Sequence, residues 1–137
     1  MQLNQVTLPL VDYDESVSFY KQLGLRLIVD APPRYARFEC VPEDGQGEPS
    51  TFSISSDGGK AVTSNTPACY FETSKVDEII NTMRNAGYEV LSEPEDKSYG
   101  WREAVIVDPA GNRVRIFWGG RNRRFPDWRI DDEKPSD

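Results

Sequence analysis

The chain has 137 residues, enough for one domain that buries about two-thirds of the surface its unfolded chain exposes. Its 16 basic and 23 acidic residues give a net charge of −7, which argues against non-specific binding to nucleic acid or to anionic membranes. It contains no histidine, so an imidazole base, a Ser-His-Asp triad and a His-ligated metal are excluded within this chain.

The first half of the chain predicts a strand, a helix and three further strands. Residues 3–11 are rich in Val and Leu, which is typical of a strand. Asp12 and Glu15 then form a capping-box pattern at the start of a helix, and Gly24 ends that helix. Three more strands are expected at residues 25–29, 34–41 and 50–56.

The second half repeats this order after a Gly- and Ser-rich linker at residues 57–66. A strand at 68–73 leads into a helix that we expect Ser74 and Asp77 to cap and Gly87 to end. Further strands are expected at residues 88–91, 101–107 and 113–118, the last two flanking a turn at 108–112. Gly24 of the first half and Gly87 of the second are related by the same offset as Asp14 and Asp77, which indicates a duplicated module.

The repeat predicts one domain at residues 1–120, because each half is too short to form a robust core alone. Module 1 covers about residues 3–56, the linker 57–66, and module 2 about 67–118. The tail at 119–137 is basic and aromatic before its acidic end. We expect the tail to pack on the domain or on a second subunit, and its end to be disordered.

Localisation is predicted from the cysteines and from the length of the apolar segments. No apolar run approaches the roughly 20 residues that span a bilayer, and the N-terminus lacks the pattern of a signal peptide. Cys40 and Cys69 lie in apolar segments, so we expect two buried free thiols in a cytoplasmic protein.

Several strings in this order resemble the vicinal oxygen chelate superfamily, which includes glyoxalase I, bleomycin resistance proteins and extradiol dioxygenases. They are residues 6–12 (VTLPLVD), 16–20 (SVSFY), 23–25 (LGL), 99–102 (YGWR) and 108–113 (DPAGNR). The resemblance covers about residues 3–118. It implies an α+β fold in which two tandem βαβββ modules form a curved mixed sheet, an open barrel around a cup-shaped cavity.

The family's four metal ligands, typically His or Gln, Glu, His and Glu, fall here on Gln5, Ser53, Ala68 and Arg115. Only the Gln5 amide is a plausible ligand among them, since a hard cation prefers several oxygen donors. The Arg115 guanidinium stays charged and would repel a dication. We therefore expect no metal at the family's site and no other cofactor.

The remaining cup is expected to bind a ligand. Strand alternation and the rim loop favour polar, cationic and aromatic contacts from Gln5, Thr7, Ser53, Tyr70, Trp101, Arg102, Arg115 and Phe117. Arg115 either clamps an anionic group of that ligand or pairs internally with Glu39, Glu72 or Glu103. No catalytic residue is singled out, because nothing in the spacing selects one of these three carboxylates as a base.

These expectations favour a metal-independent protein of the glyoxalase or bleomycin resistance type, which binds an organic, anionic or aromatic molecule. Its partners would be that ligand and a second copy in a homodimer, without nucleic acid or membrane. One alternative is a glyoxalase-type lyase, isomerase or dioxygenase that uses a divalent metal on displaced ligands. The other is a structural or regulatory module with a filled cavity.

Overall fold

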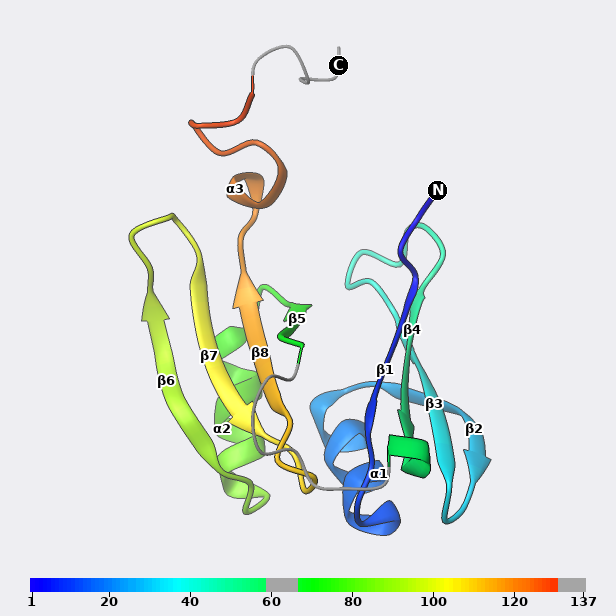
Figure 1. Ribbon diagram of the computed structural model, residues 1–137. Coiled ribbons are helices and arrows are strands. Elements are labelled where there is room, and N and C mark those ends of the chain that lie inside the picture. Colours follow the sequence, from blue (N-terminus) through cyan, green and yellow to red (C-terminus); the bar gives the residue numbers. More distant parts are fainter. Residues whose placement is uncertain (59–66, 131–137) are drawn as a thin grey trace.

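The two halves of the chain fold as two four-stranded sheets that lie side by side, with the two longer helices behind them (Figure 1). The computed structural model describes residues 1–58 and 67–130. Module 1 contains β1 (Gln5–Pro9), α1 (Tyr13–Leu23), β2 (Arg26–Ala31), β3 (Tyr35–Cys40), β4 (Ser50–Ser55) and the 3-10 turn η1 (Ser56–Gly58). Module 2 contains β5 (Cys69–Glu72), α2 (Val76–Asn85), β6 (Val90–Asp96), β7 (Arg102–Val107), β8 (Arg113–Trp118) and the short α3 (Arg121–Arg124).

Both sheets have the same topology. The strand order is β1-β4-β3-β2 in module 1 and β5-β8-β7-β6 in module 2, with the first and last strands of each module paired in parallel. The predicted α+β fold of two βαβββ modules is confirmed. The sheets are curved and do not close into a barrel.

The ends of the two helices follow different rules. The predicted cap of α1 is confirmed, since the Asp12 carboxylate accepts a hydrogen bond from the backbone N–H of Glu15 at 3.2 Å, and Gly24 follows with a φ of 111°. The predicted Ser74 cap of α2 is wrong. The N-cap is Lys75 without a side-chain bond, because Ser74 donates its N–H and hydroxyl to the Glu43 carboxylate instead.

Three further predictions need correction or fall outside the described residues. Residues 92–96, which we expected to form a loop, belong to strand β6 and pair with β7. Pro94 is tolerated there because β6 is an edge strand, where a missing backbone N–H costs no hydrogen bond. The linker begins as the turn η1, and its remainder at 59–66 lies outside the described residues, as does the tail's end at 131–137. Helix α3 is an addition that the sequence reading missed.

One apolar core joins the two modules. It combines buried side chains from both helices, such as Phe19 and Met83, with the inner faces of both sheets. Phe52 of β4 meets Phe71 of β5 edge to face, with ring centroids 5.4 Å apart. Each fully buried side chain of this core, such as Phe19, contributes about 1.5–3 kcal/mol. No helix among the described residues has the length and apolar character to cross a membrane.

A buried aspartate connects the two modules. Asp108 is 5% exposed and begins the turn between β7 and β8, where its Oδ1 accepts hydrogen bonds from the N–H groups of Ala110 and Asn112. Its Oδ2 accepts from the hydroxyl of Tyr20 at 2.6 Å and from the side-chain amide of Asn112. That amide also donates to the carbonyl oxygen of Pro9 at 2.9 Å. The turn of module 2 is therefore fixed to both the helix and the first strand of module 1.

Removal of the Tyr20 hydroxyl should weaken this connection. Tyr20→Phe leaves the buried Asp108 carboxylate with one donor fewer, and we expect a loss of about 1.5–3 kcal/mol in the free energy of unfolding, measured with urea. Tyr88→Phe is the matched control, since Tyr88 also packs on Phe19 but its hydroxyl makes no hydrogen bond among the described residues. Equal losses in the two variants would contradict the role given to the hydroxyl.

The same bond predicts a pH dependence. Burial, with the negative charge of Asp108, raises the pKa of Tyr20 well above its ordinary value of 10.0. The unfolded chain therefore loses this proton first, so the contribution of Tyr20 is complete below about pH 10 and declines as the pH rises further. Urea titrations at increasing alkaline pH should show a smaller decline for Tyr20→Phe than for the unmodified protein.

Candidate ligand-binding site

Each sheet has an outer face, formed by the side chains that alternate with those of the core. In module 1, β1 and β4 place Gln5 beside Thr51 and Thr7 beside Ser53 on this face. In module 2, β5 and β8 place Tyr70 beside Arg115. We call these surfaces the module 1 face and the module 2 face. The predicted site residues other than Arg102 divide between them, and among the described residues no hydrogen bond, ion pair or ring contact joins the two sets.

The module 1 face carries a hydrogen-bonded cluster around Tyr35. The Tyr35 hydroxyl lies 2.7 Å from the Oγ of the fully buried Ser53 and accepts a hydrogen bond from Nε of Arg37 at 2.9 Å. Burial alone would raise the pKa of Tyr35, but the hydrogen bonds from Ser53 and Arg37 outweigh it, so the pKa lies below its ordinary value. Sequence reasoning missed Tyr35 and Arg37, although they alternate with the core residues of β3.

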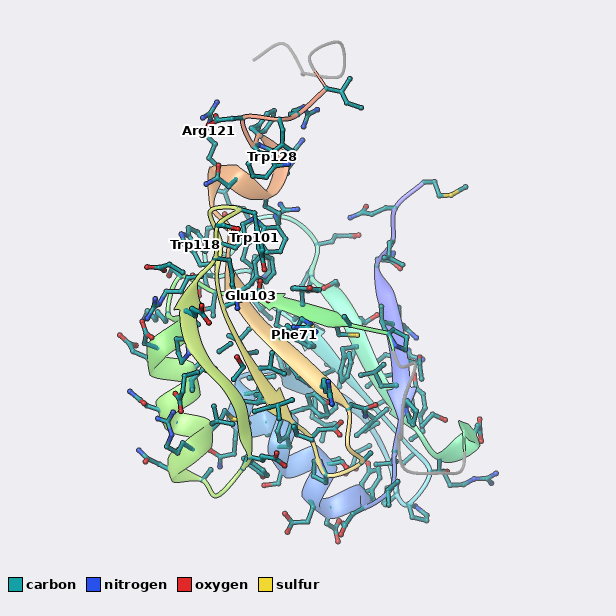
Figure 2. The ribbon with its side chains drawn as sticks, turned by 60° about the vertical axis from the view of Figure 1, so that its left-hand side comes forward. Phe71, Trp101, Glu103, Trp118, Arg121 and Trp128 are labelled. Atoms are coloured by element: carbon teal, nitrogen blue, oxygen red, sulfur yellow. The ribbon has the colours of Figure 1, made fainter. Side chains whose placement is uncertain are left out.

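The module 2 face is aromatic. Trp101 stacks on Phe117 with ring centroids 4.5 Å apart, and Tyr70 stands edge-on to both rings at 5.9 and 5.6 Å. Tyr99 adds a fourth ring, edge-on to Trp101 at 5.8 Å. Figure 2 shows Trp101 and Trp118 at the upper end of this sheet, below α3, with Glu103 beneath them. The predicted residues Tyr70, Trp101 and Phe117 therefore form one cluster.

Arg115 lies against this cluster with part of its guanidinium unpaired. Its Cζ is 5.6 Å from the centre of the Tyr70 ring, and its Nη1 is 3.8 Å from Oε2 of Glu103, longer than a hydrogen bond. The buried Nε has no hydrogen-bond partner. Glu103 is 4% exposed and accepts a hydrogen bond from the Tyr99 hydroxyl. Of the three acids considered for Arg115, Glu103 is the one in contact, and the contact is incomplete.

The register gives the two faces equivalent positions for these arginines. Arg37 on β3 pairs with Ser53 on β4 in module 1, and Val105 on β7 pairs with Arg115 on β8 in module 2. Each module thus holds one arginine at the same strand pair, but on opposite strands.

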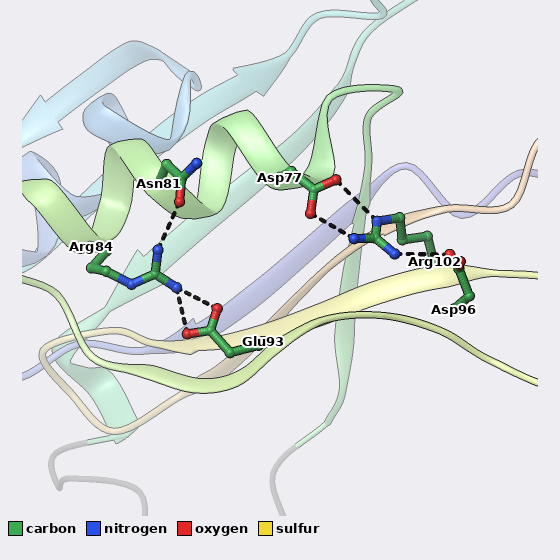
Figure 3. A network of polar contacts seen from close by, with 6 residues as sticks. All are labelled: Asp77, Asn81, Arg84, Glu93, Asp96 and Arg102. Atoms are coloured by element: carbon green, nitrogen blue, oxygen red, sulfur yellow. Dashed lines mark hydrogen bonds and ion pairs between the residues drawn. The ribbon is translucent and has the colours of Figure 1, made fainter.

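Arg102 does not join the predicted site. Its Nε and Nη2 donate to the Asp77 carboxylate at 3.1 and 2.8 Å, and its Nη1 donates to Asp96 at 2.9 Å (Figure 3). The hydrogen bonds from Arg102 hold the pKa of Asp77 below its ordinary value. A second pair in the same view joins Arg84 to Glu93. Arg102 therefore connects α2 to the edge of the sheet on the helix side, opposite to the aromatic cluster.

The residues at the family's metal positions do not fit a metal. The Gln5 amide oxygen accepts a hydrogen bond from the Thr51 hydroxyl at 2.8 Å, and Ser53 is engaged by Tyr35. Ala68 has no side-chain donor, and Arg115 would repel a dication by about 4 kcal/mol per unit charge at 4 Å. Across residues 1–58 and 67–130, no three His, Cys, Asp or Glu side chains are grouped so as to hold a metal ion.

A cleft of about 940 Å³ lies between the modules. Of the predicted site residues, Gln5, Tyr70 and Phe117 line it, while Thr7, Ser53, Trp101, Arg102 and Arg115 do not. Its volume falls in the range of small-molecule sites. The alternative of a module with a filled cavity expected no space of this size, so the cleft does not support it.

This architecture defines a tandem-module α+β protein whose polar and aromatic outer faces carry the candidate site. The model of the Glyoxalase/Bleomycin resistance protein/Dioxygenase superfamily matches residues 2–116, and the chain belongs to this family.

Solved structures agree on the fold. A glyoxalase/bleomycin resistance protein/dioxygenase family enzyme from Burkholderia phytofirmans PsJN is 19% identical, with a TM-score of 0.66, and covers 85% of this chain and 98% of its own. TioX from Micromonospora sp. ML1 is 20% identical, with a TM-score of 0.63, and the match covers 88% of this chain and 100% of TioX. Lactoylglutathione lyase from Agrobacterium tumefaciens is 19% identical, with a TM-score of 0.62, and the match covers 86% of this chain and 93% of the lyase. The curated proteins give no match.

The Tyr35 cluster makes a spectroscopic prediction. In a titration followed by the ultraviolet absorbance of tyrosinate, Tyr35 should contribute the first ionisation step, because Arg37 and Ser53 stabilise its anion. That step should disappear in Tyr35→Phe and move to higher pH in Arg37→Gln. Tyr70→Phe, which removes a phenol from the other face, should leave it in place. An unchanged first step in Tyr35→Phe would contradict the assignment.

Proposed function

We propose that this protein binds a small organic anion with an aromatic body on the module 2 face, without a metal ion. The observation that carries the proposal is the Arg115 guanidinium: its buried Nε has no hydrogen-bond partner, and its Cζ lies 5.6 Å from the centre of the Tyr70 ring. A buried donor left unpaired costs about 1–3 kcal/mol, and an anionic acceptor would remove that cost.

The surroundings of Arg115 support a planar ligand. Tyr70 packs beneath the guanidinium, and the edge-to-face arrangement of Tyr70, Trp101 and Phe117 offers rigid apolar walls. Rigid aromatic side chains lose little conformational entropy when a ligand binds. Glu103 makes no hydrogen bond to Arg115, because its Oε2 lies 3.8 Å from Nη1. The Arg115 side chain is 30% exposed, and an anion would approach this accessible part.

Gln5 is proposed to contribute a polar contact from the other module. It lines the cleft together with Tyr70 and Phe117, so a ligand that extends from the module 2 face toward β1 would meet its amide. The homodimer, the cytoplasmic location and the absence of nucleic-acid and membrane partners stay predictions.

The aromatic anion 8-anilinonaphthalene-1-sulfonate is a suitable probe, because its fluorescence rises in an apolar site. We expect saturable binding, weakened about 10- to 100-fold in Arg115→Gln, since a charge-assisted hydrogen bond contributes about 1.5–3 kcal/mol. Arg113→Gln is the matched control, as it removes the same charge from the same strand and face at an exposed position. Equal weakening in both variants would indicate general charge attraction and contradict a site at Arg115.

Metal removal should not change this binding. Protein dialysed against EDTA is expected to bind the probe with unchanged affinity, and titration calorimetry with Zn²⁺ or Ni²⁺ should detect no tight equivalent. One equivalent of metal that is lost in Gln5→Ala, but retained in the control Gln2→Ala, would overturn the metal-independent proposal. That result would favour the alternative of a metal-dependent lyase, isomerase or dioxygenase.

A further inference from the structure

The tail after β8 lies at one end of the module 2 face. We call residues 119–123 the strap, and they include the beginning of α3 (Arg121–Arg124). Figure 2 shows α3 above Trp101 and Trp118, at the upper end of the sheet. The match to the family model ends at residue 116, so membership of the family assigns the strap no role.

The backbone of the strap lies against the indole of Trp101. Nε1 of Trp101 donates a hydrogen bond to the main-chain carbonyl oxygen of Asn122 at 3.3 Å. Gly119 comes so close that a Cβ at this position would lie 3.0 Å from Nε1 and 3.2 Å from Cε2 of the same ring. Any larger residue would have to push the indole aside by a few tenths of an ångström, so this close fit requires glycine.

Trp101 is the ring through which the strap reaches the site proposed at Arg115. It stacks on Phe117 with ring centroids 4.5 Å apart and stands edge-on to Tyr70 at 5.9 Å. The Tyr70 ring in turn packs against the Arg115 guanidinium, with its centre 5.6 Å from Cζ. The strap is therefore connected to Arg115 by a continuous series of contacts.

Polar contacts anchor the strap. Nε of Arg123 lies 3.3 Å from Oε1 of Glu72 on β5, and the N–H of Gly119 donates to Oε2 of the same carboxylate at 3.4 Å. The side-chain amide of Asn122 donates a long hydrogen bond to the carbonyl oxygen of Gly100, at 3.5 Å. No residue of α3 is buried, so an apolar core does not hold this helix. The position of the strap depends on these polar contacts and on its fit against the indole.

From these contacts we infer that the strap positions Trp101 and thereby completes the aromatic wall of the site at Arg115. The strap keeps the indole stacked on Phe117 before a ligand arrives, so less conformational entropy is lost when the ligand binds. Gly119 and Arg123 are positioning residues, since they act through the indole and through Glu72. The inference rests on the proposed function, because Trp101 matters here as a wall of that site.

A double-mutant cycle with 8-anilinonaphthalene-1-sulfonate tests the coupling between Gly119 and Trp101. We expect Gly119→Ala to weaken probe binding about threefold, because the added methyl group displaces the indole and an aromatic pair is worth a factor of about two to ten. In the Trp101→Phe background the same substitution should have no effect, because phenylalanine has no Nε1 for the methyl group to meet. Equal weakening in both backgrounds would overturn the inference.

Arg123→Gln tests the anchor of the strap. It should weaken probe binding about twofold, because an exposed ion pair contributes little more than this. Arg121→Gln is the matched control, since it removes the same charge from the same helix, and the Arg121 side chain makes no ion pair among the described residues. Arg123→Lys, which can keep a pair with Glu72, should bind like the unmodified protein. Equal weakening in Arg123→Gln and Arg121→Gln would contradict the anchor and overturn the inference.

The position of Trp101 can also be measured without a ligand. In protein labelled with 5-fluorotryptophan, the fluorine NMR signal of Trp101 is identified by its loss in Trp101→Phe. This signal should move toward that of the free amino acid in Gly119→Ala and in Arg123→Gln, and stay in place in Arg121→Gln. An unmoved signal in Gly119→Ala would overturn the inference even where the probe binds. A signal that moves as expected, in a protein whose unmodified form binds no probe, would be a failure of the proposed function and not of the contact between the strap and Trp101.

Discussion

The arrangement of the two modules depends on the buried carboxylate of Asp108. A carboxylate removed from water is costly unless its oxygens accept several hydrogen bonds, and here the turn's own N–H groups, the Asn112 amide and the Tyr20 hydroxyl all donate to it. Because two of these groups also contact module 1, satisfying the charge fixes the relative position of the sheets. The turn at residues 108–112, whose sequence predicts only a hairpin, therefore also holds the two modules together.

Asp108 fixes the two modules relative to each other. Equivalent positions on their outer faces carry different side chains. In module 1 a phenol, a hydroxyl and a guanidinium are satisfied by one another around Tyr35. In module 2 the guanidinium of Arg115 is surrounded by rings and meets an acid that another residue already engages. Duplication has therefore produced one self-contained polar cluster and one incomplete one. We place the proposed ligand on the incomplete cluster, because its guanidinium still lacks a hydrogen-bond acceptor.

The sequence predicts the repeat and most element positions, because apolar periodicity and glycine stops are local signals. It predicts the aromatic residues of the site for the same reason, since alternation places Tyr70 and Phe117 on one face. It did not separate Trp101 from Arg102, although neighbouring residues of an extended chain point to opposite sides. The position of Asp77 shows that the partner of Arg102 lies on the helix side. The Ser74 cap failed because Glu43, far away in the chain, competes for its hydrogen bonds.

The Tyr35 cluster and the cleft were beyond sequence reasoning for a related reason. Both depend on how segments that no spacing rule connects are placed, such as β3 beside β4 in the sheet, or β1 and β5 on the walls of one cleft. The unpaired Nε of Arg115 likewise emerges only when the distance to Glu103 is known, because the sequence offered three acids with equal claims.

Strand β6 has a consequence for aggregation. It forms one outer edge of module 2, where unpaired backbone groups would normally invite another strand. Pro94 offers no N–H there, and Glu93, Glu95 and Asp96 carry hydrated carboxylates that are already ion-paired with Arg84, Lys97 and Arg102. A strand added at this edge would have to displace the water around these pairs. The edge is thereby protected against extension into a larger sheet.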